Sequence, residues 1–212
     1  MDIKWYGHAC FRIREKNAVV VTDPFPSSLG YNRPRTRADI VTISHDHPNH
    51  SARTGFQGEP FFITGPGEYE VAGVFVTGIR TYHDTKKGAE RGYNTVYMIR
   101  FDQLNVCHLG DLGHVPSQSQ VEDLSEVDVL LVPVGGGGAL TPAMAAETIS
   151  LIEPRIVIPM HYKTDVYDGG LLPVEQFLKV MGVKDVPVEE ELKIRSRSQL
   201  PEETQIILLS YK

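Results

Sequence analysis

The sequence has little cysteine, no long apolar run and no excess of basic residues. Among its 212 residues only Cys10 and Cys107 are cysteines, and neither belongs to a CxxC pair, so a disulfide framework is not indicated. No apolar run approaches the roughly 20 residues that span a bilayer. The opening "MDIKWYGH" lacks the charged-then-apolar layout of a secretory signal. We therefore expect a cytoplasmic protein without a membrane partner.

The charge balance is acidic, with 21 Lys and Arg against 27 Asp and Glu and a formal net charge of −6. Such a chain gains little from counterion release on a polyanion, so no nucleic-acid partner is expected. Hydrophobic residues, at 41%, can bury a sizeable core. Because no linker or change of composition divides the chain, we expect one domain over residues 1–212. The sequence does not indicate an oligomeric state.

Short runs rich in Val, Ile, Phe and Tyr, separated by Gly, Pro and Asp, predict strands. These runs cover residues 2–7, 10–14, 18–23, 39–44, 61–64, 74–79, 95–101 and 104–109. Two continuously apolar runs, 127–134 and 155–160, predict strands buried on both faces.

Helices are expected only late in the chain. Residues 141–154 begin with Thr141 as N-cap and Pro142 at the first helical position, and 173–182 end at Gly182. Strands combined with late helices predict an α/β fold of layered sheets with helices packed outside.

The stretch "ISHDHPNH" places three histidines within six positions and ends at His50. On a strand, alternate residues point the same way, so His45 and His47 are predicted to share one side and Asp46 the other. A turn after the following proline can bring Asn49 and His50 back to the same point. Neutral imidazoles bind zinc at about 2.0–2.1 Å, and three or four ligands must converge. A polar loop with scattered surface histidines is the less favoured alternative.

Three more metal-ligand residues also fall just past predicted strand ends. His83 follows the run at 74–79, Asp111 lies in the turn after 104–109, and His161 ends "RIVIPMH". Open layered sheets place their ligand sites at such edges. The sequence therefore predicts one metal site at a sheet edge.

This ordered set resembles the metallo-β-lactamase superfamily, whose signature is HxHxDH followed by a His, an Asp and a final His. The stretches "WYGHACFRI", "VTDPF", "GPGEYEVAGVFVTGI", "HLGDLG" and "VLLVPVGGG" are similar to its L-ascorbate-phosphate lactonase branch. The resemblance implies a four-layer αβ/βα sandwich with the metals between two sheets.

The resemblance also implies two metal ions. The implied first-ion ligands are His45, His47 and His83, the second-ion ligands are position 49, His50 and His161, and Asp111 bridges both. Zinc is the expected metal, with manganese or iron as alternatives. Paired ions lower the pKa of a shared water and stabilise the oxyanion formed on attack.

Position 49 departs from the signature, because it is Asn where the superfamily has Asp. An amide oxygen can bind a metal ion but brings no charge. The two positive ions are therefore balanced by one negative charge fewer. In a partly dry cleft that difference is worth several kcal/mol. We therefore expect the first ion to bind well and the second to bind weakly or not at all.

Other polar residues of the matching stretches have two interpretations each. The resemblance suggests that His8 lines the cleft as a general acid or hydrogen-bond donor, although a surface histidine is the alternative. Asp23 is either a turn aspartate or a residue that supports the site. His108 is either a core residue or a partner of a ligand. His114 is a further cleft candidate, and Glu68 is expected to face solvent or form a turn.

Two loop motifs also leave alternatives open. The glycines of "VGGGGALTP" could let backbone N–H groups approach an anion, or could simply form a tight strand-to-helix turn. Lys86, Lys87 and Arg91 could steer an anionic substrate, but a solvated face is favoured.

The leading functional prediction is a metal-dependent hydrolase that uses a metal-bound hydroxide on a small ester, lactone or phosphoester, with anionic substrates among the candidates. One alternative is a non-catalytic metal-binding or ligand-sensing protein, in which Asn49 records lost chemistry. The other is a nuclease of the same fold, which the acidic balance disfavours. The similarity to the lactonase branch also disfavours a β-lactamase.

Overall fold

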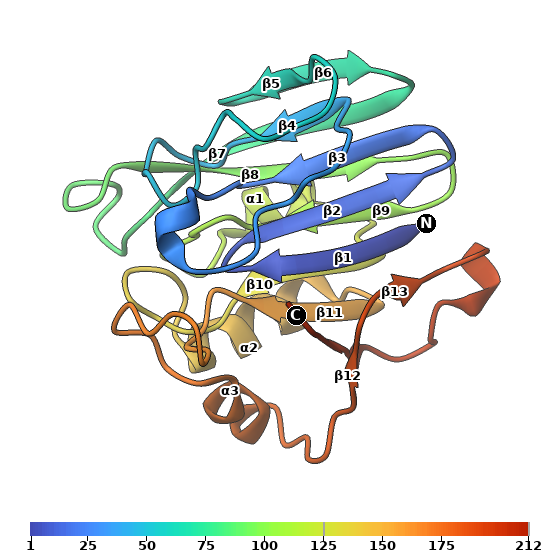
Figure 1. Ribbon diagram of the computed structural model, residues 1–212. Helices are drawn as coiled ribbons and strands as arrows, with labels where there is room; N and C mark the ends of the chain where they lie inside the picture. Colours follow the sequence, from blue (N-terminus) through green and yellow to red (C-terminus); the bar gives the residue numbers. More distant parts are fainter. Residues whose placement is uncertain (125, 212) are drawn as a thin grey trace.

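The computed structural model describes residues 1–124 and 126–211 and contains two large sheets that face each other (Figure 1). The first sheet has the order β13-β1-β2-β3-β4-β5, in which β1, β2 and β3 are antiparallel neighbours and β3, β4 and β5 are parallel. Its strands are β1 (Asp2–Gly7), β2 (Cys10–Glu15), β3 (Ala18–Thr22), β4 (Ile40–Thr42), β5 (Phe61–Ile63) and β13 (Leu192–Lys193).

The second sheet has the order β14-β11-β10-β9-β8-β7-β6 and combines parallel and antiparallel pairs. Its strands are β6 (Gly67–Val71), β7 (Val74–Tyr82), β8 (Tyr93–Arg100), β9 (Asn105–His108), β10 (Val129–Pro133), β11 (Ile156–Met160) and β14 (Gln205–Ile206). Strands β12 (Val188–Glu189) and β15 (Leu208–Leu209) form a separate pair. Because β7, β9, β10 and β11 run in one direction, their carboxyl ends meet at one edge.

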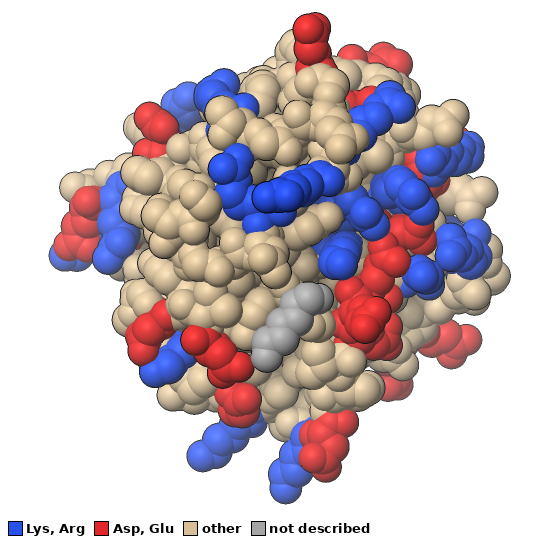
Figure 2. Space-filling model, viewed as in Figure 1, with Lys and Arg blue, Asp and Glu red and all other residues tan. Residues whose placement is uncertain are grey.

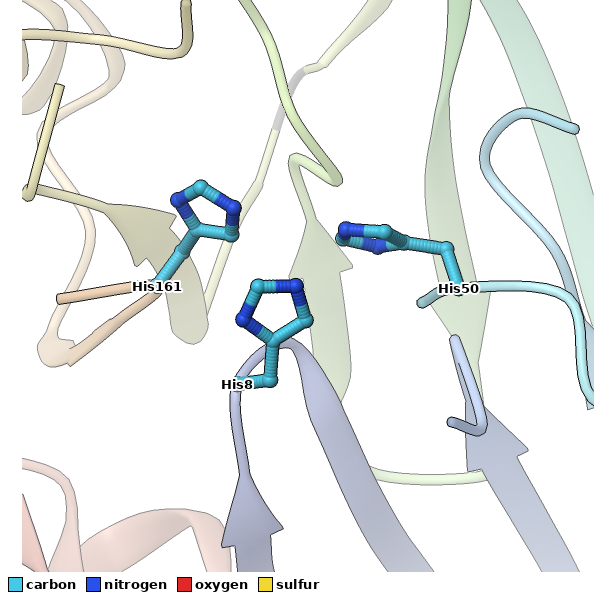
Figure 3. A group of neighbouring side chains, drawn as sticks. All are labelled: His8, His50 and His161. Atoms are coloured by element: carbon cyan, nitrogen blue, oxygen red, sulfur yellow. The ribbon is translucent and has the colours of Figure 1, made fainter. Parts of the chain in front are cut away.

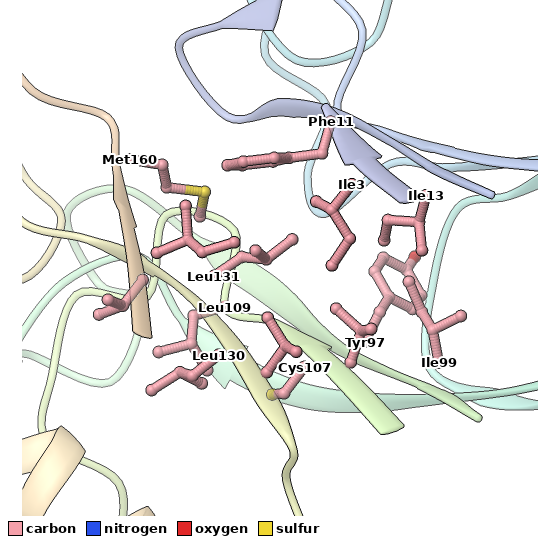
Figure 4. Packing of buried hydrophobic residues seen from close by; sticks show 14 of the residues in the cluster. Ile3, Phe11, Ile13, Tyr97, Ile99, Cys107, Leu109, Leu130, Leu131 and Met160 are labelled. Atoms are coloured by element: carbon pink, nitrogen blue, oxygen red, sulfur yellow. The ribbon is translucent and has the colours of Figure 1, made fainter. Parts of the chain in front are cut away.

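The central core fills the space between the two sheets (Figure 4). Its members from the first sheet include Ile3, Phe11 and Ile13, and those from the second include Tyr97, Ile99, Leu130, Leu131 and Met160. Leu109, directly after β9, also belongs to it. Every residue of β10 and β11 is buried, which confirms the prediction from their continuous apolar runs.

Helices cover the outer face of one sheet, and a loop segment covers that of the other. Helices α1 (Gln118–Asp123) and α2 (Pro142–Ile152) lie behind the second sheet, and α3 (Val174–Val180) packs beside α2 (Figure 1). The first sheet is covered instead by the segment between β3 and β4, which includes the short 3-10 helix η1 (Ser27–Leu29). These layers confirm the predicted α/β class.

The two predicted helices are confirmed, and their caps follow the sequence signals. The Thr141 side chain accepts a hydrogen bond from the backbone N–H of Met144 at the start of α2. Gly182, with a φ of 70°, follows α3 in the left-handed region. Helix α1, which begins with a capping box of Ser117 and Gln120, and strand β6 were not predicted.

Figure 2 shows Lys and Arg side chains gathered across the middle of one face, with Asp and Glu side chains beside and below them. Ion pairs around β1, β2 and β13 account for part of this pattern. They are Arg14–Asp2, Arg195–Asp2, Arg12–Glu191 and Lys193–Glu191. In the described part of the chain, no helix combines the length and apolar character needed to cross a membrane.

Candidate metal centre

The predicted ligands come together at the edge where strands of both sheets end. Each lies in a turn that follows the carboxyl end of a strand. His8 follows β1, Asp23 follows β3, His45, His47 and His50 follow β4, His83 follows β7, Asp111 follows β9 and His161 follows β11. Chain segments more than 150 residues apart in sequence therefore meet at one point, as the strand-end pattern predicted.

Asp111 is the centre of this cluster. Its Oδ2 atom lies 3.3 Å from the Nε2 atoms of His50 and His161, 3.5 Å from that of His83 and 3.9 Å from that of His45. The carboxylate is 3% exposed, and its backbone N–H donates a hydrogen bond to Oδ1 of Asn94. Four imidazole nitrogens thus surround one buried carboxylate oxygen.

Three of these separations, those from Oδ2 of Asp111 to His50, His83 and His161, fit ligand atoms on a shared cation, and the one to His45 is somewhat longer. Ligand atoms that bind one zinc ion at about 2.0–2.2 Å in tetrahedral directions lie roughly 3.3–3.6 Å apart. Nε2 of His45, which is one of the converging atoms, and Oδ1, the other oxygen of the Asp111 carboxylate, are buried and have no hydrogen-bond partner among the described residues. Buried polar atoms normally have partners, so these two point to an ion as the missing one. The donor set of imidazoles and carboxylate suits zinc, manganese or iron.

Asp23 fixes the orientation of two of the ligands. It is fully buried, and its carboxylate accepts hydrogen bonds from the backbone N–H and the hydroxyl of Ser44 at 2.8 and 2.5 Å. Nδ1 of His50 lies 2.9 Å from Oδ2 of Asp23, and Nδ1 of His45 lies 2.9 Å from the Ser44 hydroxyl. Because both Nδ1 atoms are engaged, both Nε2 atoms are left free to face Asp111. Of the two interpretations of Asp23, its contacts favour support of the site.

Burial keeps two of these imidazoles, His45 and His83, in the neutral form that binds metal. Burial and the neighbouring His50 lower the pKa of His45 to about 4, and burial lowers the pKa of His83. Burial also opposes protonation of His50, but the carboxylates of Asp111 and Asp23 outweigh it and raise its pKa to about 10. Burial would raise the pKa of Asp111, but His161 and His50 hold it well below its usual range. A divalent ion would take the place of the proton on Nε2 of His50, which faces Asp111, while Nδ1 stays paired with Asp23.

Three of the converging residues have left-handed backbone conformations that are rare for residues other than glycine. The φ angles are 53° for His8, 35° for Asp23 and 51° for His161. Each costs on the order of 1–3 kcal/mol and persists only where surrounding contacts enforce it. The backbone N–H of His161 donates to the carbonyl of His8, which ties two of these positions together. Such strain cannot be predicted from the sequence pattern.

The structure corrects the predicted reason why His45 and His47 lie together. The prediction extended the strand through both histidines, but the strand ends at Thr42, so strand alternation orients neither side chain. A tight turn brings the two rings within 5.9 Å of each other, with His45 partly buried and His47 exposed at the mouth. Asp46 is exposed.

The remaining candidates, His108, His114 and Glu68, do not line the cavity. His108 is fully buried, and its Nε2 lies 2.9 Å from the Ala9 carbonyl, which fits the core interpretation. His114 accepts a hydrogen bond from the backbone N–H of Tyr82 and does not belong to the cavity lining. Glu68 faces solvent, as expected, but on strand β6 and not in a turn.

A polar cavity of about 190 Å³ opens onto the cluster. Besides the ligands, Asn49, Arg91 and Tyr167 line it. Sequence reasoning missed Tyr167, which arrives on the loop after β11, and assigned Arg91 to a solvated face. No signal in the sequence indicates either contact, because both depend on loop conformation.

The glycine run after β10 forms a close-packed turn. A Cβ atom on Gly135 would lie 2.3 Å from the carbonyl oxygen of His161, and one on Gly138 would lie 2.6 Å from Cζ of Arg91. Of the two interpretations of this run, its contacts favour the turn, which allows the chain to pass closely behind His161.

Gly135→Ala is therefore expected to lower the free energy of unfolding by about 2 kcal/mol, since the added methyl group meets backbone that cannot move aside. For a chain of this length that corresponds to a melting temperature about 4–8 °C lower. Gly65→Ala is the matched control, because a Cβ there meets nothing within 4 Å. Thermal unfolding of both variants tests the packing, and equal melting temperatures would contradict it.

The two facing sheets and the histidine–aspartate cluster at their edge are those of a metal-binding sandwich protein. The chain matches the family described as "Beta-lactamase superfamily domain" over residues 2–161. A UPF0173 protein of Pyrococcus abyssi is 32% identical over 193 residues, covering 80% of this chain and 86% of the relative. A UPF0173 metal-dependent hydrolase of Methanopyrus kandleri is 26% identical, and the alignment covers 83% of this chain and 87% of that relative.

A solved structure from Thermotoga maritima is also similar. It is described as a candidate Zn-dependent hydrolase of the metallo-β-lactamase superfamily and aligns with a TM-score of 0.80 and 37% identity. The alignment covers 98% of this chain and 97% of that one. The chain belongs to the β-lactamase superfamily and, within it, to the UPF0173 proteins. The predicted superfamily and fold are confirmed, whereas the relation to the lactonase branch stays a prediction.

Proposed function

We propose that the chain is a metal-dependent hydrolase of small ester, lactone or phosphoester substrates. The observation that carries this proposal is the convergence of four imidazole nitrogens on Oδ2 of Asp111 at the cavity. When bound, a divalent ion supplies an activated water and a Lewis acid for the scissile bond. Relatives named metal-dependent hydrolases support the same activity.

The size of the cavity favours a small molecule. Its volume of about 190 Å³ accommodates the reacting group of a substrate and little of the rest of the molecule. Tyr167 and Leu171 are among the lining residues. Ion pairs such as Arg12–Glu191 and Arg14–Asp2 partner basic side chains, and the formal net charge of −6 disfavours binding of a polyanion. The nuclease alternative therefore gains no support.

Arg91 favours a substrate that carries a negative charge. Its side chain is exposed at the cavity and packs closely against Gly138. The carboxylate of Asp84 accepts backbone hydrogen bonds from Lys86, Gly88, Glu90 and Arg91 at 2.7–3.0 Å, so the loop that bears the guanidinium is held in one conformation. A guanidinium fixed in this way can bind a carboxylate or phosphate in bidentate fashion.

The test is hydrolysis of carboxyl-ester, lactone and phosphodiester probes by purified, metal-loaded protein, in matched anionic and uncharged versions. We expect turnover that a chelator abolishes and added zinc or manganese restores. Arg91→Gln should raise KM about tenfold for the anionic version alone, equivalent to about 1.4 kcal/mol. Lys86→Gln, at an exposed lysine paired with Glu90, is the control that leaves both KM values unchanged.

Other outcomes favour the alternatives. Bound metal without turnover of any probe would support a metal-binding or ligand-sensing protein. Turnover only after Asn49→Asp would indicate that the catalytic function has been lost. Strongly salt-dependent binding and cleavage of RNA would favour the nuclease.

A further inference from the structure

The side chain of Asn49 is hydrogen-bonded to Tyr167. Its Nδ2 donates a hydrogen bond to the hydroxyl of Tyr167 at 3.4 Å, and its backbone N–H lies 3.3 Å from Nδ1 of His47. The amide is thus directed toward the loop after β11. This leaves one side of the cluster, next to His50 and His161, without the ligand that the superfamily signature would supply there.

We propose that His8 fills that place and forms a second metal position with His50 and His161. The three residues are 3%, 1% and 6% exposed, and each offers a ligand atom within 4.8 Å of the other two. The proposal rests on the proposed metal-dependent function. It assigns to His8 a role as ligand in place of the general-acid role predicted from the sequence.

The three rings converge from separate elements (Figure 3). The His8 ring centroid lies 4.6 Å from that of His50 and 4.5 Å from that of His161. A separate group of ligand atoms, from His45, His83 and Asp111, lies beside it. Because His50 and His161 both lie 3.3 Å from Oδ2 of Asp111, that carboxylate borders both groups.

The backbone holds His8 in a conformation that aims its ring inward. The residue has a φ of 53°, and its carbonyl accepts hydrogen bonds from the indole N–H of Trp5 and the backbone N–H of His161, both at 3.1 Å. Its Nδ1 is buried and has no hydrogen-bond partner among the described residues. A strained, anchored histidine with an unpartnered nitrogen in a cluster of ligands is suited to metal coordination.

The charge of the ligands determines which of the two metal positions binds its ion more tightly. The three ligands of the second position are imidazoles, and the Asp111 carboxylate that borders it belongs to the ligand group of the first. We therefore expect the second ion to bind at least about tenfold more weakly than the first. This order agrees with the expectation from Asn49 and assigns the weaker position to specific residues.

The experiment is a Co²⁺ and Zn²⁺ titration of metal-stripped protein, followed by absorption spectroscopy and elemental analysis. Wild-type protein should take up two ions per chain at saturation, and His8→Gly should take up one. Glycine is chosen because it adopts the positive φ of this position without strain. His114→Ala is the control that keeps two ions, and His8→Gly combined with Asn49→Asp should regain the second. An unchanged unfolding midpoint confirms that each variant is folded, and His8→Asn replaces His8→Gly if it is not.

The possible failures are distinguishable. Two ions in His8→Gly, or one ion in saturated wild-type protein, would overturn the role of His8 and leave the proposed hydrolase intact. Absence of any bound ion in wild-type protein would overturn both proposals.

Discussion

We expect Asp111→Asn to lower the hydrolytic rate by about 10³-fold or more. The substitution removes the negative charge that four imidazole nitrogens face within 3.9 Å, so the ion is held less tightly and is less well oriented. A loss of about 4 kcal/mol in transition-state stabilisation corresponds to this factor. Steady-state kinetics with the best probe substrate, at saturating metal, measure the effect.

Asp46→Asn is the matched control for this prediction. It makes the same chemical change in the stretch that carries three of the histidines, but its side chain is exposed and faces solvent. The control should keep wild-type kcat/KM. Equal losses in the two variants would show that general charge matters, and not the position of Asp111.

The second large effect is expected for Asp23→Ala. The substitution leaves the Nδ1 proton of His50 and the Ser44 hydroxyl without their buried acceptor. Loss of such a partner costs about 10–100-fold in metal affinity, and about 3 kcal/mol in the free energy of unfolding because a buried charge pair is broken. Competition with a chromophoric chelator gives the affinity, and denaturant unfolding gives the stability.

Asp39→Ala separates the two consequences. Asp39 lies just before β4, and its carboxylate accepts a hydrogen bond from the backbone N–H of Val19, away from the metal cluster. This control should lose stability but retain metal affinity. An Asp23→Ala protein that is unstable yet binds zinc as tightly as wild-type would contradict the orienting role of Asp23.

The location of the site at a sheet edge could be predicted from the sequence, because each ligand follows a strand-forming run. Hydrophobic patterning locates strand ends without knowledge of the tertiary structure, and His83, Asp111 and His161 all proved to be correctly placed. The same reasoning failed for His45 and His47, because it extended strand alternation through a turn that begins after Thr42. The side chains meet for a different reason than predicted.

The cavity walls could not be predicted. Tyr167 and Arg91 reach the site on loops whose conformations depend on individual hydrogen bonds, such as those that Asp84 accepts from its own loop. The pairing of Asp23 with His50 joins residues 27 positions apart and needs the left-handed backbone at Asp23. Such contacts depend on tertiary geometry and leave no periodic pattern in the sequence.

The most direct test is anomalous diffraction from crystals of zinc-loaded protein, collected on both sides of the zinc absorption edge. We predict an anomalous peak about 2.0–2.2 Å from Oδ2 of Asp111 and within bonding distance of histidine Nε2 atoms. Zinc-loaded crystals with no peak at Asp111, or with peaks at surface residues only, would contradict a metal centre at this position.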